Sequence, residues 1–373
     1  MTFVIITHVP HILEQNQYFG YAPYVREMNI WIKQADKVLI VAPRSNASKT
    51  PIEINYEHDN IEFKTIETFN LLSLKEIAGS LYKIPTISWQ IFKSMKQADH
   101  IHLRCPGNIG LLGCFIQVLF PNTPKTAKYA GNWDPNSIQP WTYCLQKGML
   151  NNTFLTRNMQ VLVYGDWKGS TANIKSFFTA TYKEADKAPL VAKHFKEKIS
   201  FLFVGTLTKG KNPLYAVQLV EALHDKGFAV DLCLYGEGVK RNDLESYIDE
   251  RKRNEIIFLK GNQNQETVKK AFQDSHFVIL PSRSEGWAKA IVEGMFWGSV
   301  PLVSQVSCIP SFLDNGNRGV LLTMDLRKDV AQMEILLTNE ADYQNRRKKA
   351  AEWSRKYTLD FFEQEIKKLI KTK

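Results

Sequence analysis

The chain has 373 residues, of which 44% are hydrophobic, and this length and composition suit two packed domains better than one. Lys and Arg outnumber Asp and Glu by 48 to 38, so an acidic partner has to be considered. The basic residues are spread over both halves, and no zinc-finger, RNA-recognition or helix-turn-helix pattern accompanies them. This distribution argues against a nucleic acid and leaves phosphorylated small molecules or an anionic membrane surface.

The apolar runs are too short for a membrane span. The longest, residues 109–120, contains Gln117 and falls short of the roughly 18 residues that a span needs. The first residues lack the basic start and the long apolar region of a signal peptide. We therefore expect a cytoplasmic protein, with peripheral contact to the inner face of the membrane as an open alternative.

Short β-rich runs alternate with helix-length segments in both halves, which predicts two mostly parallel sheets with helices on their faces. In the first half the expected strands are 3–7, 37–42, 100–103, 125–130 and 160–164. In the second half they are 200–204, 229–234, 255–259, 276–280, 300–303 and 319–322. The fold class is thus α/β, with two doubly wound, Rossmann-like domains.

A polar, charge-rich stretch at 181–188 separates the two series of strands, as expected of a linker. We predict an N-terminal domain of residues 1–190 and a C-terminal domain of residues 191–355. Apolar residues between 359 and 370 form one stripe of a helix. We expect residues 356–373 to form a terminal helix that packs on or near the N-terminal domain.

The strongest chemical signal is the run Ser282–Gly298, which follows a buried strand. A strand, a glycine-containing loop and a helix aim free backbone N–H groups and the positive helix end at an anion such as a diphosphate. Glu285 lies in the loop, and Glu293 should lie five or six residues into the helix. Their carboxylates suit the hydroxyls of a sugar or ribose. The ordinary alternative is a helix N-terminal acid and an exposed helix residue.

A second loop that follows a strand and opens a helix argues against a purely structural role for Glu285 and Glu293. The run Val204–Pro213 also follows a buried strand and opens a helix. Gly205 permits a close backbone approach, and Lys211 near the helix start supplies a positive charge for phosphate. Two strand ends suited to anions in one sheet indicate a phosphate-bearing ligand.

On these residues the C-terminal half resembles a family 4 glycosyltransferase of the GT-B fold. The resemblance rests on Glu285 and Glu293 as a paired-glutamate motif, on Gly286-Trp-Ala288 in place of Gly-Phe-Gly, and on the run from Gly205 to Lys211. It covers about residues 199–355, whereas the N-terminal half is similar only in strand order. It implies two domains that face a cleft, and retaining transfer of a sugar from a nucleoside diphosphate sugar to a glycan or lipid-linked acceptor.

The resemblance also implies roles for individual residues. Glu293 would bind the ribose, Glu285 would contact the donor sugar near the reacting carbon, and Lys211 would neutralise the leaving diphosphate. Backbone N–H groups of residues 286–288 would bind the phosphates, and Asn262 would lie near the base. The full donor-binding set is Gly205, Thr206, Lys211, Asn262, Glu285, Gly286, Trp287, Ala288, Lys289 and Glu293.

Two departures from the family pattern concern charge and proton transfer. Thr206 stands where the family usually has an Arg after the glycine that Gly205 represents, so one phosphate-binding charge is missing. We expect Lys289 to supply that charge in preference to Lys209 or Arg283. Asn132 stands where the family often has a His, and an amide cannot act as a general base near neutral pH. Proton acceptance would then fall to the departing phosphate, with Glu285, Lys211 and Asn132 as the catalytic set.

The acceptor side is less defined. We expect it to involve Gly20, Arg104, Asn132 and Trp133, with Trp133 able to stack on a sugar ring. Residues 71–96 mix apolar side chains with lysines, which suits either an interfacial surface or a pair of core-facing helices with solvated lysines. A metal site at His8 and His11 is not expected, because no third ligand is near and no Asp-x-Asp pattern occurs.

We therefore expect no cofactor and no metal, with the nucleotide-sugar acting as substrate. The five cysteines occur singly and suit reduced core thiols. Two other functions stay open on the same fold. One is a nucleotide-sugar epimerase or hydrolase, which would need an acid and a base in the N-terminal domain. The other is a binding protein without catalysis, which the departures at Thr206 and Asn132 would suit.

Overall fold

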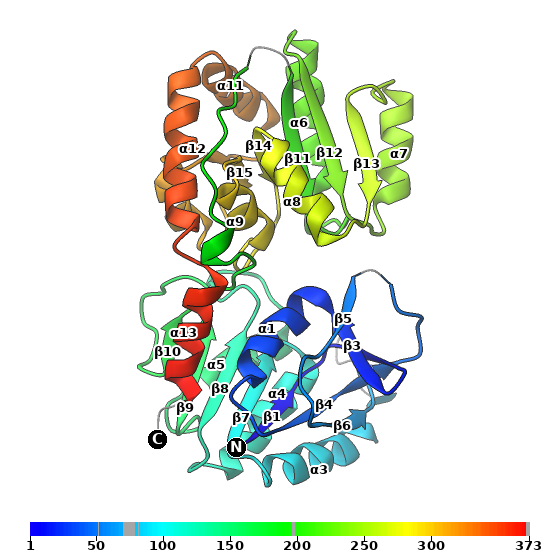
Figure 1. Cartoon of the computed structure of the whole chain (residues 1–373), viewed down its shortest axis with the longest axis vertical. Coiled ribbons are helices and arrows are strands. Elements are labelled where there is room, and N and C mark those ends of the chain that lie inside the picture. The colour runs from blue at the N-terminus through cyan, green and yellow to red at the C-terminus, as the bar shows by residue number, and fades with distance from the viewer. Residues whose placement is uncertain (51, 70–78, 81, 196–197, 371–373) are drawn as a thin grey trace. The chain divides into compact units, whose positions relative to one another are not determined.

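The computed structural model describes residues 1–50, 52–69, 79–80, 82–195 and 198–370. The chain divides into two compact units (Figure 1). Unit 1 comprises Met1–Phe178 together with Phe362–Lys373, and unit 2 comprises Thr179–Phe361. No helix within the described residues is long and apolar enough to cross a membrane.

Unit 1 is built on a parallel sheet in the order β10-β9-β8-β7-β1-β4-β6. These strands are β1 (Thr2–Ile6), β4 (Lys37–Ser45), β6 (Ile61–Ile66), β7 (His100–Cys105), β8 (Lys125–Tyr129), β9 (Met159–Val163) and β10 (Ile174–Ser176). A small extension, β2 (His11–Glu14), β3 (Gln17–Tyr21) and β5 (Glu53–Asn55), joins the end of β4. All five strands predicted for this half are present.

Helices cover this sheet. They are α1 (Ala22–Ile32), α3 (Lys83–Met95), α4 (Asn108–Ile116), the 3-10 turn η1 (Gln117–Leu119), α5 (Trp141–Leu150) and α13 (Leu359–Ile370). Helix α3 packs against α4, and α4 packs against α5, so these three form one layer. One core cluster of unit 1 lies between this layer and the sheet.

Unit 2 repeats the design with a sheet in the order β13-β12-β11-β14-β15-β16, all parallel. Its strands are β11 (Ile199–Val204), β12 (Val230–Tyr235), β13 (Ile257–Gly261), β14 (Phe277–Leu280), β15 (Val300–Ser304) and β16 (Val320–Leu322). Its helical segments are η2 (Glu184–Asp186), α6 (Pro213–Asp225), α7 (Arg241–Glu250), α8 (Gln265–Asp274), α9 (Lys289–Phe296), α10 (Ile309–Phe312), η3 (Asp314–Gly316), α11 (Leu326–Leu337) and α12 (Glu340–Ser354). The prediction of two doubly wound α/β sheets is confirmed.

The division between the units lies at Phe178, twelve positions before the predicted boundary at 190. Tyr182 explains the difference, because its ring packs on Phe296 and Trp297 in the core of unit 2. The backbone N–H of Leu359 also donates to the Tyr182 carbonyl over 2.8 Å. The remainder of α13 belongs to unit 1, where Phe362 contacts the rings of Phe177 and Phe178.

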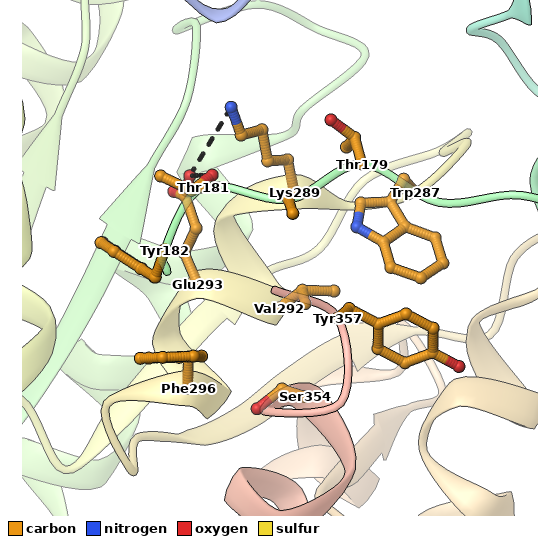
Figure 2. Close-up of a pocket in the computed structure, with 11 residues that line it drawn as sticks. Thr179, Thr181, Tyr182, Trp287, Lys289, Val292, Glu293, Phe296, Ser354 and Tyr357 are labelled. Carbon is orange, nitrogen blue, oxygen red and sulfur yellow. Dashed lines mark hydrogen bonds and ion pairs between the residues drawn. The ribbon is translucent and has the colours of Figure 1, made fainter. Parts of the chain in front are cut away.

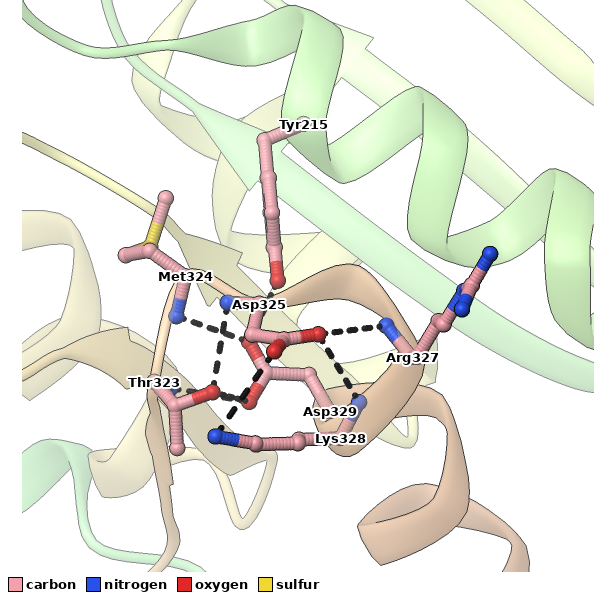
Figure 3. Close-up of polar contacts among 7 residues, drawn as sticks. All are labelled: Tyr215, Thr323, Met324, Asp325, Arg327, Lys328 and Asp329. Carbon is pink, nitrogen blue, oxygen red and sulfur yellow. Dashed lines mark hydrogen bonds and ion pairs between the residues drawn. The ribbon is translucent and has the colours of Figure 1, made fainter.

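A buried carboxylate fastens α11 to the rest of unit 2 (Figure 3). Asp329 is fully buried and accepts hydrogen bonds from the Thr323 N–H and hydroxyl, both over 2.8 Å, and from the Met324 N–H over 3.1 Å. The Tyr215 hydroxyl of α6 donates to the other side of the same carboxylate. One side chain thus joins α6, the end of β16 and α11.

Candidate functional site

The strand order of unit 2 reverses between β11 and β14, which is where doubly wound sheets form a ligand-binding crevice. Along the chain the sheet runs 3-2-1-4-5-6, so the connections leave β11 and β14 in opposite directions. Ligands of doubly wound sheets bind at the carboxyl ends of the strands at such a switch point. The loops that follow β11 and β14 are held together here, because the Arg283 N–H donates to the Gly210 carbonyl over 2.8 Å. These loops carry both runs that the sequence singles out.

An ion pair joins the two loops. The Lys211 ammonium lies 2.6 Å from a carboxylate oxygen of Glu285. The Glu285 side chain is only 6% exposed, whereas that of Lys211 is 31% exposed. The buried carboxylate therefore has its counter-charge, and the ammonium keeps further N–H donors on its solvent side for an anion.

The loop after β14 enters α9 through a strained residue. Ala288 has φ +48° and ψ 56°, the left-handed region that glycine adopts without strain, and it is buried. It stands at the position where the family pattern has glycine. The Ile291 and Val292 N–H groups donate to the Ala288 carbonyl over 2.9 and 3.3 Å, so the N–H groups of Lys289 and Ala290 are the ones that precede the hydrogen bonds of the helix. N–H groups at a helix start suit a phosphate.

We expect Ala288→Gly to raise the stability of unit 2. Replacing an alanine in the left-handed conformation by glycine removes about 1–2 kcal/mol of strain from the folded state. Glycine also gives the unfolded chain more conformational freedom, which lowers the gain in the free energy of unfolding by about half. The matched change Ala290→Gly, inside α9, should instead lower stability by about 0.5–1 kcal/mol. Chemical denaturation of both variants checks this pair, and two shifts of the same sign would contradict it.

Aromatic packing fixes the loop from behind. The Trp287 ring is buried and contacts Phe312 and Tyr357, with ring centroids 4.8 and 5.2 Å away. The Cys308 thiol donates to the Gly286 carbonyl over 3.2 Å. Trp287 therefore anchors the loop with its side chain, and the expected contact of its backbone N–H with a phosphate stays a prediction.

Glu293 lies on α9 in a pocket formed by this helix, residues 179–182 and the end of α12 (Figure 2). It is the fifth residue of α9, which confirms its predicted depth in the helix. Its carboxylate accepts a hydrogen bond from the Thr181 hydroxyl over 2.5 Å and lies 3.8 Å from the Lys289 ammonium. Lys289 is thus held beside the helix start, where it was expected to supply positive charge.

The other predicted donor residues lie along the same edge. Gly205 directly follows β11, and its N–H donates to the Tyr235 carbonyl over 2.9 Å. Thr206 follows it and is exposed. Asn262 is exposed directly after β13, two strands away from the switch point. The structure therefore brings Lys211 and Glu285 together, has Gly205 at the start of the loop that carries Lys211, and leaves Asn262 farther along the sheet.

Sequence reasoning missed the loop after β12. Gly236 has φ +143°, and a Cβ there would lie 2.0 Å from the Gly205 carbonyl oxygen. A Cβ on Gly238 would lie 2.5 Å from the Leu207 carbonyl oxygen. Only glycine lets the loop after β12 lie this close to the loop after β11. The Gly-x-Gly spacing directly after a strand was the signal that could have revealed it.

Unit 1 has a switch point of its own, between β1 and β7. Gly107, after β7, has φ +151°, and a Cβ there would lie 2.8 Å from Nδ1 of His8, which follows β1. The pKa of His8 is lowered by loss of hydration and, second, by the positive charge of Arg104. Both causes favour the neutral form of its imidazole. The sequence analysis had weighed His8 only as a metal ligand.

Two of the residues expected on the acceptor side, Arg104 and Gly20, have partners within unit 1. The Arg104 guanidinium lies 3.2 Å from a carboxylate oxygen of the buried Glu27 and over the Tyr24 ring. Gly20 lies within β3, paired with Ile54 of β5. Both residues have structural partners, so their contact with an acceptor stays a prediction.

Asn132 and Trp133 form a turn after β8. The Asn132 side-chain oxygen accepts from the Asp134 N–H over 2.9 Å, and its carbonyl accepts from the Gln139 side chain. Trp133 is 5% exposed and packs edge-on against Tyr129 in the core of unit 1. A ring in that position cannot stack on a sugar without leaving the core, which corrects the expectation for its side chain.

The family of unit 2 follows from this geometry and from comparison with known proteins. Residues 186–353 match the family described as glycosyl transferases group 1. The chain carries a group 1 glycosyl transferase domain, and its recognition as a glycosyltransferase of the GT-B fold is confirmed. Its place in family 4 stays a prediction.

Two relatives come from Staphylococcus aureus. The chain is 22% identical to Protein CapJ over 295 residues, which cover 74% of this chain and 71% of CapJ. It is 23% identical to poly(ribitol-phosphate) alpha-N-acetylglucosaminyltransferase over 169 residues, which cover 45% of this chain and 33% of the relative. The chain thus spans about a third of the second relative's length.

A solved structure matches the whole chain. HepE from Anabaena in complex with UDP-glucose aligns with a TM-score of 0.70 at 13% identity, and the alignment covers 100% of both chains. At this identity the likeness establishes the fold, and it agrees with the two doubly wound sheets described above.

Proposed function

We propose that this protein is a retaining glycosyltransferase that transfers a sugar from a nucleoside diphosphate sugar to a glycan or lipid-linked acceptor. The synthesis of a cell-surface polysaccharide or glycolipid is the process that its relatives' names favour. The observation that carries the proposal is the Lys211–Glu285 pair at the switch point of unit 2, where two loops meet beside the start of α9.

The chemistry of this crevice suits a leaving diphosphate. During transfer the bond between the anomeric carbon and the phosphate oxygen breaks, and a bond from the acceptor oxygen to that carbon forms on the same face. Negative charge grows on the diphosphate as it leaves. A lysine placed against it, together with the N–H groups at the α9 start, stabilises that charge more in the transition state than in the ground state.

The acceptor hydroxyl must lose its proton during the transfer, and some group must take up that proton. In a same-face reaction the departing diphosphate oxygen lies next to the attacking hydroxyl and can take the proton itself. Asn132 would then act by hydrogen bonding to a sugar hydroxyl, since an amide does not take up a proton near neutral pH. This route needs no metal and no cofactor.

The uridine series is the first donor class to test, because HepE holds UDP-glucose. Consumption of a uridine diphosphate sugar should depend on added acceptor, and NMR of the product should show the anomeric configuration of the donor retained. Consumption that is equally fast without acceptor would instead identify a hydrolase. A product of inverted configuration would overturn the retaining mechanism while leaving the transferase class in place.

Glu293→Ala should weaken donor binding by about 10- to 150-fold. The expected cause is the loss of a hydrogen bond from a ligand hydroxyl to a charged acceptor, which is about 1.5–3 kcal/mol. Glu250→Ala, at an exposed position at the end of α7, is the matched control. Calorimetric titration with the donor nucleotide measures both dissociation constants, and equal values for the variant and the wild type would remove Glu293 from the site.

A further inference from the structure

The layer formed by α3, α4 and α5 in unit 1 presents apolar side chains outward. On α3 the buried residues include Ile87, Ile91 and Met95, whereas Trp89 on the opposite side is 56% exposed. An apolar side chain belongs on the sheet-facing side of such a helix, so this tryptophan is on the unexpected side. It stacks on Phe92 with ring centroids 5.7 Å apart.

The neighbouring helices repeat the arrangement. Phe115 and Leu119 lie four residues apart on α4 and η1, and both are exposed. On α5 the buried side is formed by residues such as Gln146 and Met149, while Trp141 and Leu145 are exposed. Just beyond α5, Phe154 is 70% exposed.

These side chains belong to one surface, because their helices pack side by side. The ring of Phe92 also reaches Phe120, the residue after η1, at 5.5 Å, which links the outer side of α3 to the end of η1. We call the exposed apolar residues of this layer the outer helical face. Its members are Trp89, Phe115, Leu119, Trp141, Leu145 and Phe154.

The charged residues within the helical segments of this layer are all basic. The helical segments α3, α4, η1 and α5 contain no Asp or Glu. Lys93 and Lys96 are exposed on α3, four and seven residues after Trp89, and the Lys93 ammonium lies 5.2 Å from the Trp89 ring. The Arg157 guanidinium lies 4.7 Å from the Phe154 ring. Two of the exposed aromatic rings, Trp89 and Phe154, are thus paired with cations.

We propose that the outer helical face docks on the surface of an anionic phospholipid bilayer. Tryptophan and phenylalanine side chains insert at the level of the headgroups, and flanking lysines and arginines attract anionic lipid. A second copy of this chain fits less well, since two such faces would bring like charges together. The segment 70–78 and residue 81, part of the stretch whose apolar residues and lysines suggested an interfacial surface, lie outside the described residues and carry none of this argument.

Vesicle flotation tests the proposal without any nucleotide, so its outcome is independent of the transferase activity. We expect the full chain to float with phosphatidylcholine vesicles that contain about 30% phosphatidylglycerol, and to float much less with phosphatidylcholine alone or at high salt. The double variant Trp89→Ser/Trp141→Ser should lose at least about tenfold in vesicle affinity, and so should Lys93→Glu/Lys96→Glu.

Matched controls come from exposed positions of the same kinds in unit 2. Val239→Ser/Ile335→Ser removes two apolar side chains, and Lys328→Glu/Lys348→Glu reverses two charges. Both controls should float as the wild type does. Failure of the wild type to bind anionic vesicles overturns the proposal. So does equal loss in controls and test variants, or a change of self-association in the test variants by analytical ultracentrifugation.

Discussion

Lys211→Ala is expected to lower kcat by about 10²–10³-fold, the loss that follows removal of one preorganised charge-stabilising group. The ammonium of Lys211 is held at the switch point by Glu285 and faces the place where a diphosphate would leave. Because the charge on that group grows during the reaction, the loss should fall mainly on kcat and less on the donor dissociation constant. Initial rates over a range of donor concentrations separate the two quantities.

The same change leaves the buried Glu285 carboxylate without its counter-charge, so the variant must be shown to be folded. Lys226→Ala is the matched control, because Lys226 forms an ion pair of 2.9 Å with Glu334 after the end of α6, away from the crevice. We expect it to retain wild-type kcat. A Lys211→Ala variant with wild-type turnover would remove the central charge from the proposed mechanism.

Asp329→Ala is expected to destabilise unit 2 by about 3–5 kcal/mol. The carboxylate is fully buried and accepts hydrogen bonds from Thr323, Met324 and Tyr215. Its removal leaves buried donors without an acceptor, and each such donor costs about 1–3 kcal/mol. The connection between α6, β16 and α11 should loosen first, and urea denaturation followed by circular dichroism measures the loss.

A neighbouring carboxylate gives the control for that loss. Asp325 caps the start of the same helix and accepts from the N–H groups of Arg327 and Lys328 at the surface (Figure 3). Asp325→Ala should cost only about 1 kcal/mol, the usual value for an N-cap. If both variants lost the same amount, burial would not be the reason for the effect at Asp329.

Much of the fold could be predicted because it depends on local patterns. Most predicted strands are buried runs rich in aliphatic and aromatic residues, and parallel strands in a doubly wound sheet show this most strongly. The hairpin of β2 and β3 was missed. Its turn residues Gln15 and Asn16 both have positive φ, and only the Asn belongs to the usual two-residue turn pairs.

The site could be predicted in part for a similar reason. Lys211 and Glu285 each follow a strand, and adjacent parallel strands end at the same edge, so their proximity follows from the topology. The contact between Thr181 and Glu293 does not follow from the topology. The sequence of a polar linker does not show which distant residues the linker will contact. The burial of Trp133 could not be predicted either. The sequence pattern of an aromatic residue after a strand is the same whether its side chain faces a ligand or the core.

Binding of nucleoside diphosphates, followed by thermal unfolding, tests the central claim most directly. The claim is that the crevice of unit 2 holds a nucleotide-sugar through Lys211, Glu293 and the start of α9. At about 100 times its dissociation constant a ligand adds about 2.7 kcal/mol, which raises the melting temperature by a few degrees. We predict such a shift with one base series, unchanged by a chelator and reduced in Glu293→Ala. No shift with the uridine, guanosine, adenosine or cytidine series would contradict the claim and favour a protein without catalysis.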